Sequence, residues 1–194
     1  THLSMERTHR WAERSLEAFR SRETEGPALF GIVQGGDYED LRRESARFIG
    51  GLDFEGVALG GALGTSQADI RQVLEWTIPV LPENKPRHLL GIGWVEDVLT
   101  AVRMGIDLMD CVAPTRLART GTFLHKKESR FRLRIRNREY RRDSRPVEED
   151  CPCPTCAAYS RAYLRHLFMA GEPLGFRLAA QHNLHFMETL MTGL

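Results

Sequence analysis

Short apolar runs and helical patterns alternate strictly over the first 110 residues of the chain. Each run ends in glycines or an acid, which is typical of strands buried in a parallel sheet. This alternation predicts parallel pairing through right-handed helical crossovers, and therefore an α/β fold. The predicted strands are Ala28–Gly36, Gly56–Gly61, His88–Gly93 and Gly105–Asp110, and the helices between them are Asp40–Ile49, Gln67–Val80 and Val95–Met104. Another predicted helix, Ser4–Arg22, begins with Ser4 as its N-cap, and a turn over Pro114–Arg116 is predicted after the last strand.

The carboxyl ends of these strands carry the candidate site. Parallel strands present their carboxyl ends at one edge of the sheet, where ligands of α/β proteins bind. The residues that would converge there are Gln34, Gly60, Gly61, Gly91 and Asp110. Asp110 is the candidate for chemistry, and the glycines would let the backbone approach a flat ligand. Taken alone, Asp110 could simply cap a turn and Gln34 could make a loop hydrogen bond. The cluster favours a ligand site.

Length and composition exclude several classes of protein. With 194 residues, 42% hydrophobic residues and a net charge of +1, the chain can bury a core and is unlike a disordered tail. No apolar run approaches the ~20 residues of a membrane helix. Residues 1–11 lack the apolar core of a signal peptide. We therefore expect a soluble, cytoplasmic protein without a membrane partner.

Arginine is concentrated in one stretch, where eight of the sixteen residues from 130 to 145 are Arg. Two strands are predicted here, Gly121–Leu124 and Phe131–Arg136. The second alternates apolar and basic residues, the period of a strand with one buried and one cationic face. Such a face can meet the phosphates of a nucleic acid. The alternative is an ordinary solvated sheet edge.

Three of the four cysteines lie within six residues, as Cys151, Cys153 and Cys156. In an intracellular protein this spacing favours a metal site over a disulfide framework. A structural zinc site needs about four ligands drawn from Cys and His, so a histidine must complete the set. The downstream candidates are His166, His182 and His185, and spacing alone does not choose between them.

Seven motifs together resemble the bacterial tRNA-guanine transglycosylases, also called queuine tRNA-ribosyltransferases. In chain order they are GIVQGG (31–36), ALGG (58–61), LLGIG (89–93), GIDLMDCVAPTR (105–116), C-x-C-x-x-C (151–156), SRAYLRHL (160–167) and QHN (181–183). The resemblance covers nearly the whole chain and implies a (β/α) TIM barrel with an inserted zinc-binding subdomain. It implies an enzyme, a pentosyltransferase that exchanges the wobble guanine of tRNAs with a G-U-N anticodon for a 7-deazaguanine precursor of queuosine.

The same resemblance assigns roles at the strand ends. It makes Asp110 the nucleophile, which attacks the anomeric carbon of the ribose and holds the tRNA covalently while bases exchange. A carboxylate suits this role because it splits a difficult displacement at a glycosidic carbon into two steps. The resemblance also implies that Gln34, Gly60 and Gly61 bind the deazaguanine base and that Leu90 packs on it.

The remaining implied roles concern RNA and metal. Arg116 and Arg119 match contacts with the tRNA anticodon loop. His182 is selected as the fourth ligand of a Zn site that the three clustered cysteines begin. The family forms homodimers partly through this region, so the resemblance implies a homodimer here.

The chain resembles only the second half of the family's barrel. Such a barrel needs eight strands and about 250 residues, whereas four strands precede the arginine-rich stretch. We therefore predict three segments: the second half of a barrel (1–118), a basic β insertion (119–150), and a zinc-binding subdomain with the closing C-terminal helix (151–194). The general base and the aspartate that reads the base would lie in the other half. The unpaired sheet edges favour a complementing N-terminal half.

Two departures from the family concern the incoming base and the tRNA. The loop Gly60–Ser66 lacks a residue and an acid that members usually carry, and Trp94 stands where a lysine is common. The alternative function is a non-catalytic, zinc-containing tRNA-binding partner subunit, or an inactive fragment. A third reading is a metabolic α/β barrel fragment acting on a small phosphorylated substrate. Such a fragment would need neither the arginine-rich strand nor the cysteine loop.

Overall fold

The computed structural model describes residues 1–22, 26–61 and 66–194. They divide into two compact units, here called the N-terminal unit (Thr1–Cys111) and the C-terminal unit (Val112–Leu194), and each is described by itself. The loop in which we predict the loss of an acid includes residues 62–65, which lie outside the described residues. The segment boundaries after residues 118 and 150 stay predictions.

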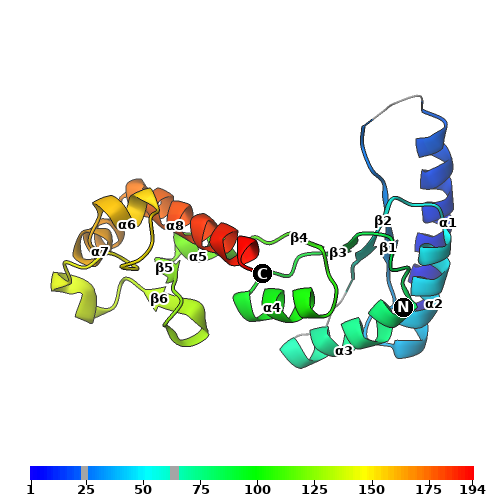
Figure 1. Cartoon of the computed structure of the whole chain (residues 1–194), viewed down its shortest axis with the longest axis horizontal. Helices are drawn as coiled ribbons and strands as arrows, with labels where there is room; N and C mark the ends of the chain where they lie inside the picture. The colour runs from blue at the N-terminus through cyan, green and yellow to red at the C-terminus, as the bar shows by residue number, and fades with distance from the viewer. Residues whose placement is uncertain (23–25, 62–65) are drawn as a thin grey trace. The chain divides into compact units, whose positions relative to one another are not determined.

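The N-terminal unit is built on a parallel sheet, which confirms the predicted α/β fold (Figure 1). Its strands are β1 (Phe30–Val33), β2 (Gly56–Leu59), β3 (Arg87–Leu89) and β4 (Leu108–Met109). They follow one another in the sheet in chain order, and each neighbouring pair is parallel. This is the order that successive right-handed crossovers produce. Closure into a barrel, half of which this sheet would form, stays a prediction.

Helices connect these strands as the sequence predicts. They are α2 (Glu39–Gly51), α3 (Gln67–Thr77, continued by the 3-10 turn η1, Ile78–Val80) and α4 (Val95–Arg103), and α1 (His2–Arg20) precedes β1. A capping box starts α3, because the Ser66 hydroxyl accepts from the Asp69 N–H and the Asp69 carboxylate accepts from the Ser66 N–H. The prediction that Ser4 caps α1 is wrong: the Met5 N–H donates to the Thr1 carbonyl, so the helix begins one turn earlier.

One face of the sheet packs against the helices and forms the core. Alternate strand residues point to the same face. Val33, Leu59 and Leu89 are fully buried in one row, together with Ile49 of α2 and Leu74 of α3. The register places the preceding residue of each strand in a row on the opposite face. That row is Ile32, Ala58, His88 and Leu108. We call this opposite side of the sheet the open face.

The prediction that the fourth strand is buried is wrong. Leu108 is 46% exposed and Met109 only half-buried. Within the described residues, β4 is two residues long and pairs only with β3, so it forms an edge of the sheet. Leu108 also points to the open face, where Ile32 of β1 is 39% exposed. The open face is therefore exposed at both edge strands, β1 and β4.

The C-terminal unit packs helices around a two-stranded antiparallel sheet. Its strands are β5 (Thr122–Leu124) and β6 (Arg132–Arg134), and its helices are α5 (Ala113–Arg119), α6 (Pro154–Ala158), α7 (Arg161–Ala170) and α8 (Pro173–Thr192), with 3-10 turns η2 (Ser129–Phe131) and η3 (Arg138–Arg142). Phe123, Leu133 and Leu164 lie in its buried core. Gly171 ends α7 in the left-handed conformation, with φ of 75°, which favours glycine.

One segment of this unit differs from the sequence prediction. Residues 114–116 are predicted as a turn, but they lie inside α5. Pro114 occupies the first turn of that helix, where its missing N–H is not needed.

In the part of the chain that the structure describes, no helix combines the length and the apolar character required to cross a membrane.

We expect Leu89→Ala to lower the free energy of unfolding of the N-terminal unit by about 2–5 kcal/mol, because it leaves a cavity under the sheet. All three tryptophans, Trp11, Trp76 and Trp94, lie in this unit, so urea unfolding followed by tryptophan fluorescence reports on it selectively. Leu3, which is 75% exposed, supplies the matched control: Leu3→Ala should change stability by less than about 0.5 kcal/mol. Equal losses in both variants would contradict the core assignment.

Candidate active site and metal centre

The predicted convergence at the strand ends follows from the sheet register. The ladder continues past the assigned strands, since the Gly60 N–H donates to the Val33 carbonyl and the Leu90 N–H to the Leu59 carbonyl. The residue that directly follows each member of the buried row therefore points to the open face, because side chains alternate along a strand. Its members are Gln34, Gly60, Leu90 and Asp110. The residues predicted to bind a base thus lie on the same face as the predicted nucleophile.

Asp110 directly follows β4; its side chain is 59% exposed, and one of its oxygens contacts neighbouring residues. Its Oδ1 accepts the Gly91 N–H at 3.1 Å, and His88 Nε2 lies 3.2 Å from the same oxygen. Gly91 has φ of +72°, a left-handed conformation that favours glycine and lets its N–H reach the carboxylate. Both contacts are made by Oδ1, so Oδ2 is the oxygen offered to a ligand. The turn contact with Gly91 and a chemical role for Asp110 are therefore compatible.

The neighbouring glycines lie close to the side chains around them. A Cβ on Gly61, whose φ is +82°, would collide with Gln34 Oε1. A Cβ on Gly60 would lie 3.0 Å from Ile32 and 3.3 Å from Leu90. The backbone at 60 and 61 can therefore lie directly against the Gln34 amide and the Leu90 side chain. This arrangement offers a flat apolar surface beside backbone and amide hydrogen-bonding groups.

The side chain of Arg42, in α2, hydrogen-bonds to the loops that follow β1 and β2. The sequence analysis did not identify Arg42 as a site residue. Its side chain is fully buried; Nε donates to the Gly36 carbonyl at 2.8 Å and Nη1 to the Gly60 carbonyl at 2.9 Å. Burial, partly opposed by Asp37, lowers the pKa of Arg42 to about 10, so it stays charged near neutral pH. One guanidinium thus ties the chain after β1 to the chain after β2. Its sequence context, a run of charges in a helix, resembles an ordinary solvated face.

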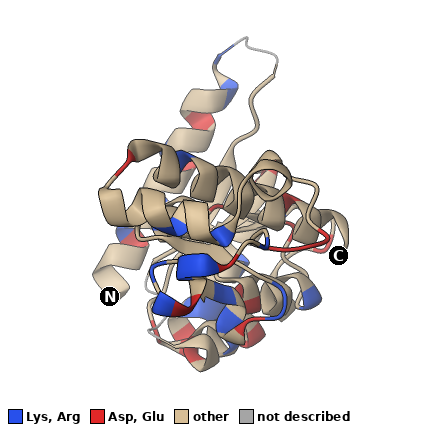
Figure 2. Cartoon of the chain, turned by 90° about the vertical axis from the view of Figure 1, so that its left-hand side faces the viewer, with Lys and Arg blue, Asp and Glu red and all other residues tan. Residues whose placement is uncertain are grey.

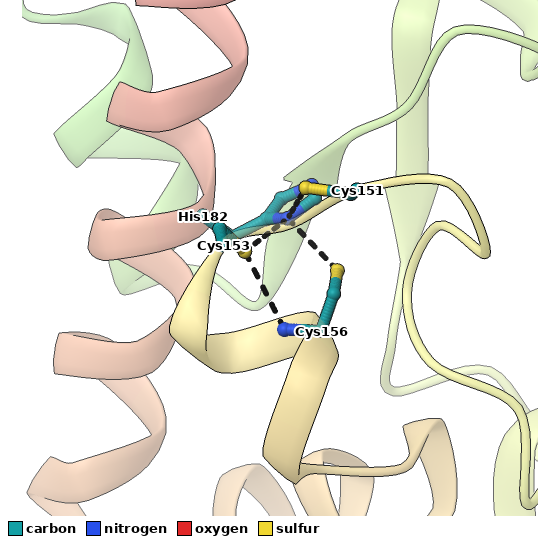
Figure 3. A group of neighbouring side chains, drawn as sticks. All are labelled: Cys151, Cys153, Cys156 and His182. Atoms are coloured by element: carbon teal, nitrogen blue, oxygen red, sulfur yellow. Dashed lines mark hydrogen bonds between the residues drawn. The ribbon is translucent and has the colours of Figure 1, made fainter.

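The four predicted metal ligands come together in the C-terminal unit (Figure 3). The Sγ atoms of Cys151, Cys153 and Cys156 lie 3.9, 3.5 and 3.4 Å from Nδ1 of His182, and all four ligand atoms lie within 4.8 Å of one another. Tetrahedral zinc with ordinary Zn–S and Zn–N bonds would hold a sulfur and a nitrogen about 3.6 Å apart. The donor set therefore fits a metal ion of this kind. The other two candidate histidines are not part of the cluster.

His182 is oriented for metal binding by the residues around it. It is fully buried, and its Nε2–H donates to the Leu124 carbonyl at 2.8 Å, which leaves Nδ1 free to face the sulfurs. Asn183, which the sequence prediction did not single out, donates to the Pro114 and Thr122 carbonyls and accepts the Leu124 N–H. These adjacent residues of α8 tie the metal cluster to β5 and α5.

The cysteines differ in their ionisation. Burial raises the pKa of each thiol, and for Cys151 and Cys156 it is the main effect. At Cys153 hydrogen bonds with His182 and from the Cys156 N–H outweigh burial and lower the pKa to about 6. Cys153 also caps α6, since its Sγ accepts the Cys156 N–H. Of the three thiols, that of Cys153 therefore has the lowest pKa.

The predicted RNA-binding residues are exposed. Arg116 and Arg119 lie three residues apart on α5, and both side chains are accessible. In β6, Leu133 is buried while Arg134 is exposed and Arg132 half-buried, which confirms the period-two pattern. Figure 2 shows that basic positions gather in the lower part of that view with acidic positions among them. The contact of Arg116 and Arg119 with an anticodon loop stays a prediction.

Comparisons with known proteins agree with these features. A family model described as queuine tRNA-ribosyltransferase matches residues 1–194. A relative from Archaeoglobus fulgidus is 50% identical over 98% of this chain. Relatives named queuine tRNA-ribosyltransferase, from Halalkalibacterium halodurans and Lactococcus lactis, are each 50% identical over 97% of it. The chain spans 48%, or about half, of the length of each of these relatives.

Replacing a metal ligand should remove zinc and loosen only the C-terminal unit. We expect His182→Ala or Cys153→Ser to reduce bound zinc from about one ion per chain to a small fraction, because three ligands hold the ion poorly. Metal analysis by mass spectrometry measures the loss. The melting temperature followed by circular dichroism should fall, while tryptophan fluorescence, which reports on the N-terminal unit, should not change.

His166 is the matched control, since it is exposed on α7 and lies outside the cluster. His166→Ala and His185→Ala should both retain zinc. Equal zinc loss in either of these variants would show that the fourth ligand is misassigned.

Proposed function

The chain belongs to the queuine tRNA-ribosyltransferase family, and from this premise we propose that it performs the base-exchange half-reactions of a tRNA-guanine transglycosylase. In this proposal the wobble guanine of tRNAs with a G-U-N anticodon is replaced by a 7-deazaguanine precursor of queuosine. The observation that carries it is Asp110, an exposed carboxylate with one oxygen tethered and the other open, on the same face as Gln34, Gly60 and Leu90.

The proposed chemistry proceeds in two displacements. Asp110 Oδ2 attacks C1′ of the wobble ribose, forming an ester-like C–O bond while the C1′–N9 bond breaks and guanine leaves with the bonding electron pair. The leaving guanine takes up a proton from an acid outside this chain. N9 of the incoming base then gives up its proton and attacks C1′, which releases the carboxylate. The two steps leave Asp110 unchanged and balance as an exchange of bases.

The row beside Asp110 supports a site for a flat, polar heterocycle. The Gln34 amide can both donate and accept hydrogen bonds, and the glycines expose backbone groups without side chains. Leu90 supplies apolar contact at the same edge. Arg42 holds this geometry by fixing the Gly36 and Gly60 carbonyls, and a pre-set site loses less entropy on binding.

Zinc would be held by Cys151, Cys153, Cys156 and His182, where a four-ligand site supplies structural stability rather than chemistry. We propose that this module holds α5, which carries Arg116 and Arg119, for contact with the anticodon loop. Because the chain spans about half of its relatives, we propose that activity needs a complementing N-terminal half, which would provide the general base and the second base-reading carboxylate. A homodimer is the other proposed assembly.

The covalent intermediate provides the central test. We expect labelled G-U-N tRNA to form an adduct that survives denaturing electrophoresis, with the chain alone or together with the N-terminal half of the Halalkalibacterium halodurans relative. Asp110→Ala should abolish the adduct because it removes the carboxylate that attacks C1′. Exchange of labelled guanine into the tRNA should fall in parallel.

Asp107→Ala is a useful control, because Asp107 is an exposed acid three residues away whose Oδ2 accepts the Arg87 N–H. It should retain adduct formation. Zinc-dependent tRNA binding without any adduct, in the wild type and both variants, would instead support the non-catalytic partner subunit.

Arg116 and Arg119 should contribute to tRNA affinity through phosphate contacts. We expect the double variant Arg116→Ala/Arg119→Ala to reduce the slope of log K against log salt concentration by about 1.4, for two contacts to a single-stranded loop. Filter binding at several salt concentrations measures the slope. Arg7→Ala, which removes an exposed arginine of α1, is the control and should leave the slope unchanged. An unaltered slope in the double variant would contradict this role.

A further inference from the structure

His88 lies on the open face beside the proposed nucleophile, and the family resemblance gives it no role. The register aligns it with Ala58 of β2 and Leu108 of β4, two residues before Leu90 along the same chain. Because alternate strand residues share a face, the imidazole extends toward the same side as the Asp110 carboxylate. Its Nε2 lies 3.2 Å from Asp110 Oδ1, so the imidazole and the carboxylate are in direct contact.

The surroundings hold this imidazole in place. Its side chain is only 27% exposed, and the Phe30 ring of β1 meets it edge to face, with ring centroids 6.4 Å apart and planes at 90°. An aromatic contact of this kind restricts ring rotation. The ring is therefore fixed on one side by Phe30 and faces the carboxylate on the other.

We propose that His88 is a positioning residue for Asp110, an inference that rests on the proposed function. An ionised carboxylate has no proton to give, so in this proposal Nε2 of the imidazole carries a proton and donates it to Oδ1. Together with the Gly91 N–H, this donor fixes the carboxylate torsion and leaves Oδ2 toward the ribose. His88 does not touch the reacting carbon in this arrangement and acts only through Asp110.

The two half-reactions depend on this contact differently. In the covalent intermediate Oδ1 is an ester carbonyl, whereas in the free enzyme it shares a full negative charge. A hydrogen bond to a charged oxygen is stronger than one to a neutral oxygen. The donor therefore stabilises the carboxylate as it departs, which favours the second displacement, in which the incoming base releases the tRNA. Loss of the donor should slow that step most.

The test compares two substitutions that differ only in the donor. His88→Phe keeps a ring against Phe30 but removes the N–H, and His88→Gln restores a donor of similar reach. We expect the preformed tRNA adduct to resolve on addition of guanine about tenfold or more slowly in His88→Phe. In His88→Gln the rate should stay within about threefold of the wild type. The KM for tRNA and for base should change little in both variants.

A second measurement needs no activity. In the wild-type chain, ¹⁵N NMR of the histidine rings should show the Nε2–H tautomer for His88, with its resonances identified by their loss in His88→Gln. Asp110→Ala should shift these resonances, while those of the His9 ring, which stacks on Phe48 and contacts Ser45 of α2, should not move. The variants His88→Gln and Asp110→Ala should both have the tryptophan fluorescence of the wild type, which would show that their N-terminal unit is folded.

The adduct experiments and the NMR measurement distinguish failure of the transglycosylase proposal from failure of the positioning role of His88. If no adduct forms in any sample but the His88 resonances respond to Asp110→Ala, the transglycosylase proposal fails and the pairing of His88 with Asp110 stands. An Nδ1–H tautomer, or resonances unaffected by Asp110→Ala, overturns the positioning role. Adduct resolution at the wild-type rate in His88→Phe, or equally slow in His88→Gln, overturns it as well.

Discussion

The parallel register of β1 to β4 is the constraint on which the candidate active site depends. Parallel strands advance together, so residues at equal distance past each strand end form a row, and alternation sends that row to one face. The row of Val33, Leu59 and Leu89 is buried under the helices. The next row, which ends with Asp110, must then lie on the open face. A shift of one residue in any strand would send its site residue into the core.

The C-terminal unit is organised by a different interaction, the paired hydrogen bonding of two neighbours on α8. Nε2 of His182 donates to the Leu124 carbonyl, and Nδ1 faces the cysteine sulfurs. The Asn183 side chain hydrogen-bonds to three backbone groups of α5 and β5. The backbone groups that these two side chains contact belong to buried residues, where an unpaired polar group is costly. Metal binding, the position of β5 and the start of α5 are therefore coupled through a single helical turn.

The features of this structure that follow a simple period or spacing could be predicted from the sequence. The strand and helix alternation predicts the sheet order, and the cysteine spacing predicts a metal cluster. Spacing alone leaves the fourth ligand open, because the choice of His182 depends on a carbonyl 58 residues away in sequence, that of Leu124. Arg42 and His88 were missed for the same reason, since their partners Gly60 and Asp110 follow other strands of the chain. Pro114 was taken as a turn because proline starts a helix as readily as it ends one.

The open face links the chemistry to the stability of the N-terminal unit. Sheets made only of parallel strands are ordinarily covered on both faces, but within this unit the helices cover one, and Ile32 and Leu108 are exposed on the other. Asp110 lies on that same face, so water reaches it as freely as a ribose would. A covalent ribose ester formed there would be open to hydrolysis, which destroys the exchange that the proposed reaction requires. In the proposed reaction, exclusion of water from Asp110 and burial of Ile32 and Leu108 are therefore requirements on the same face of the sheet.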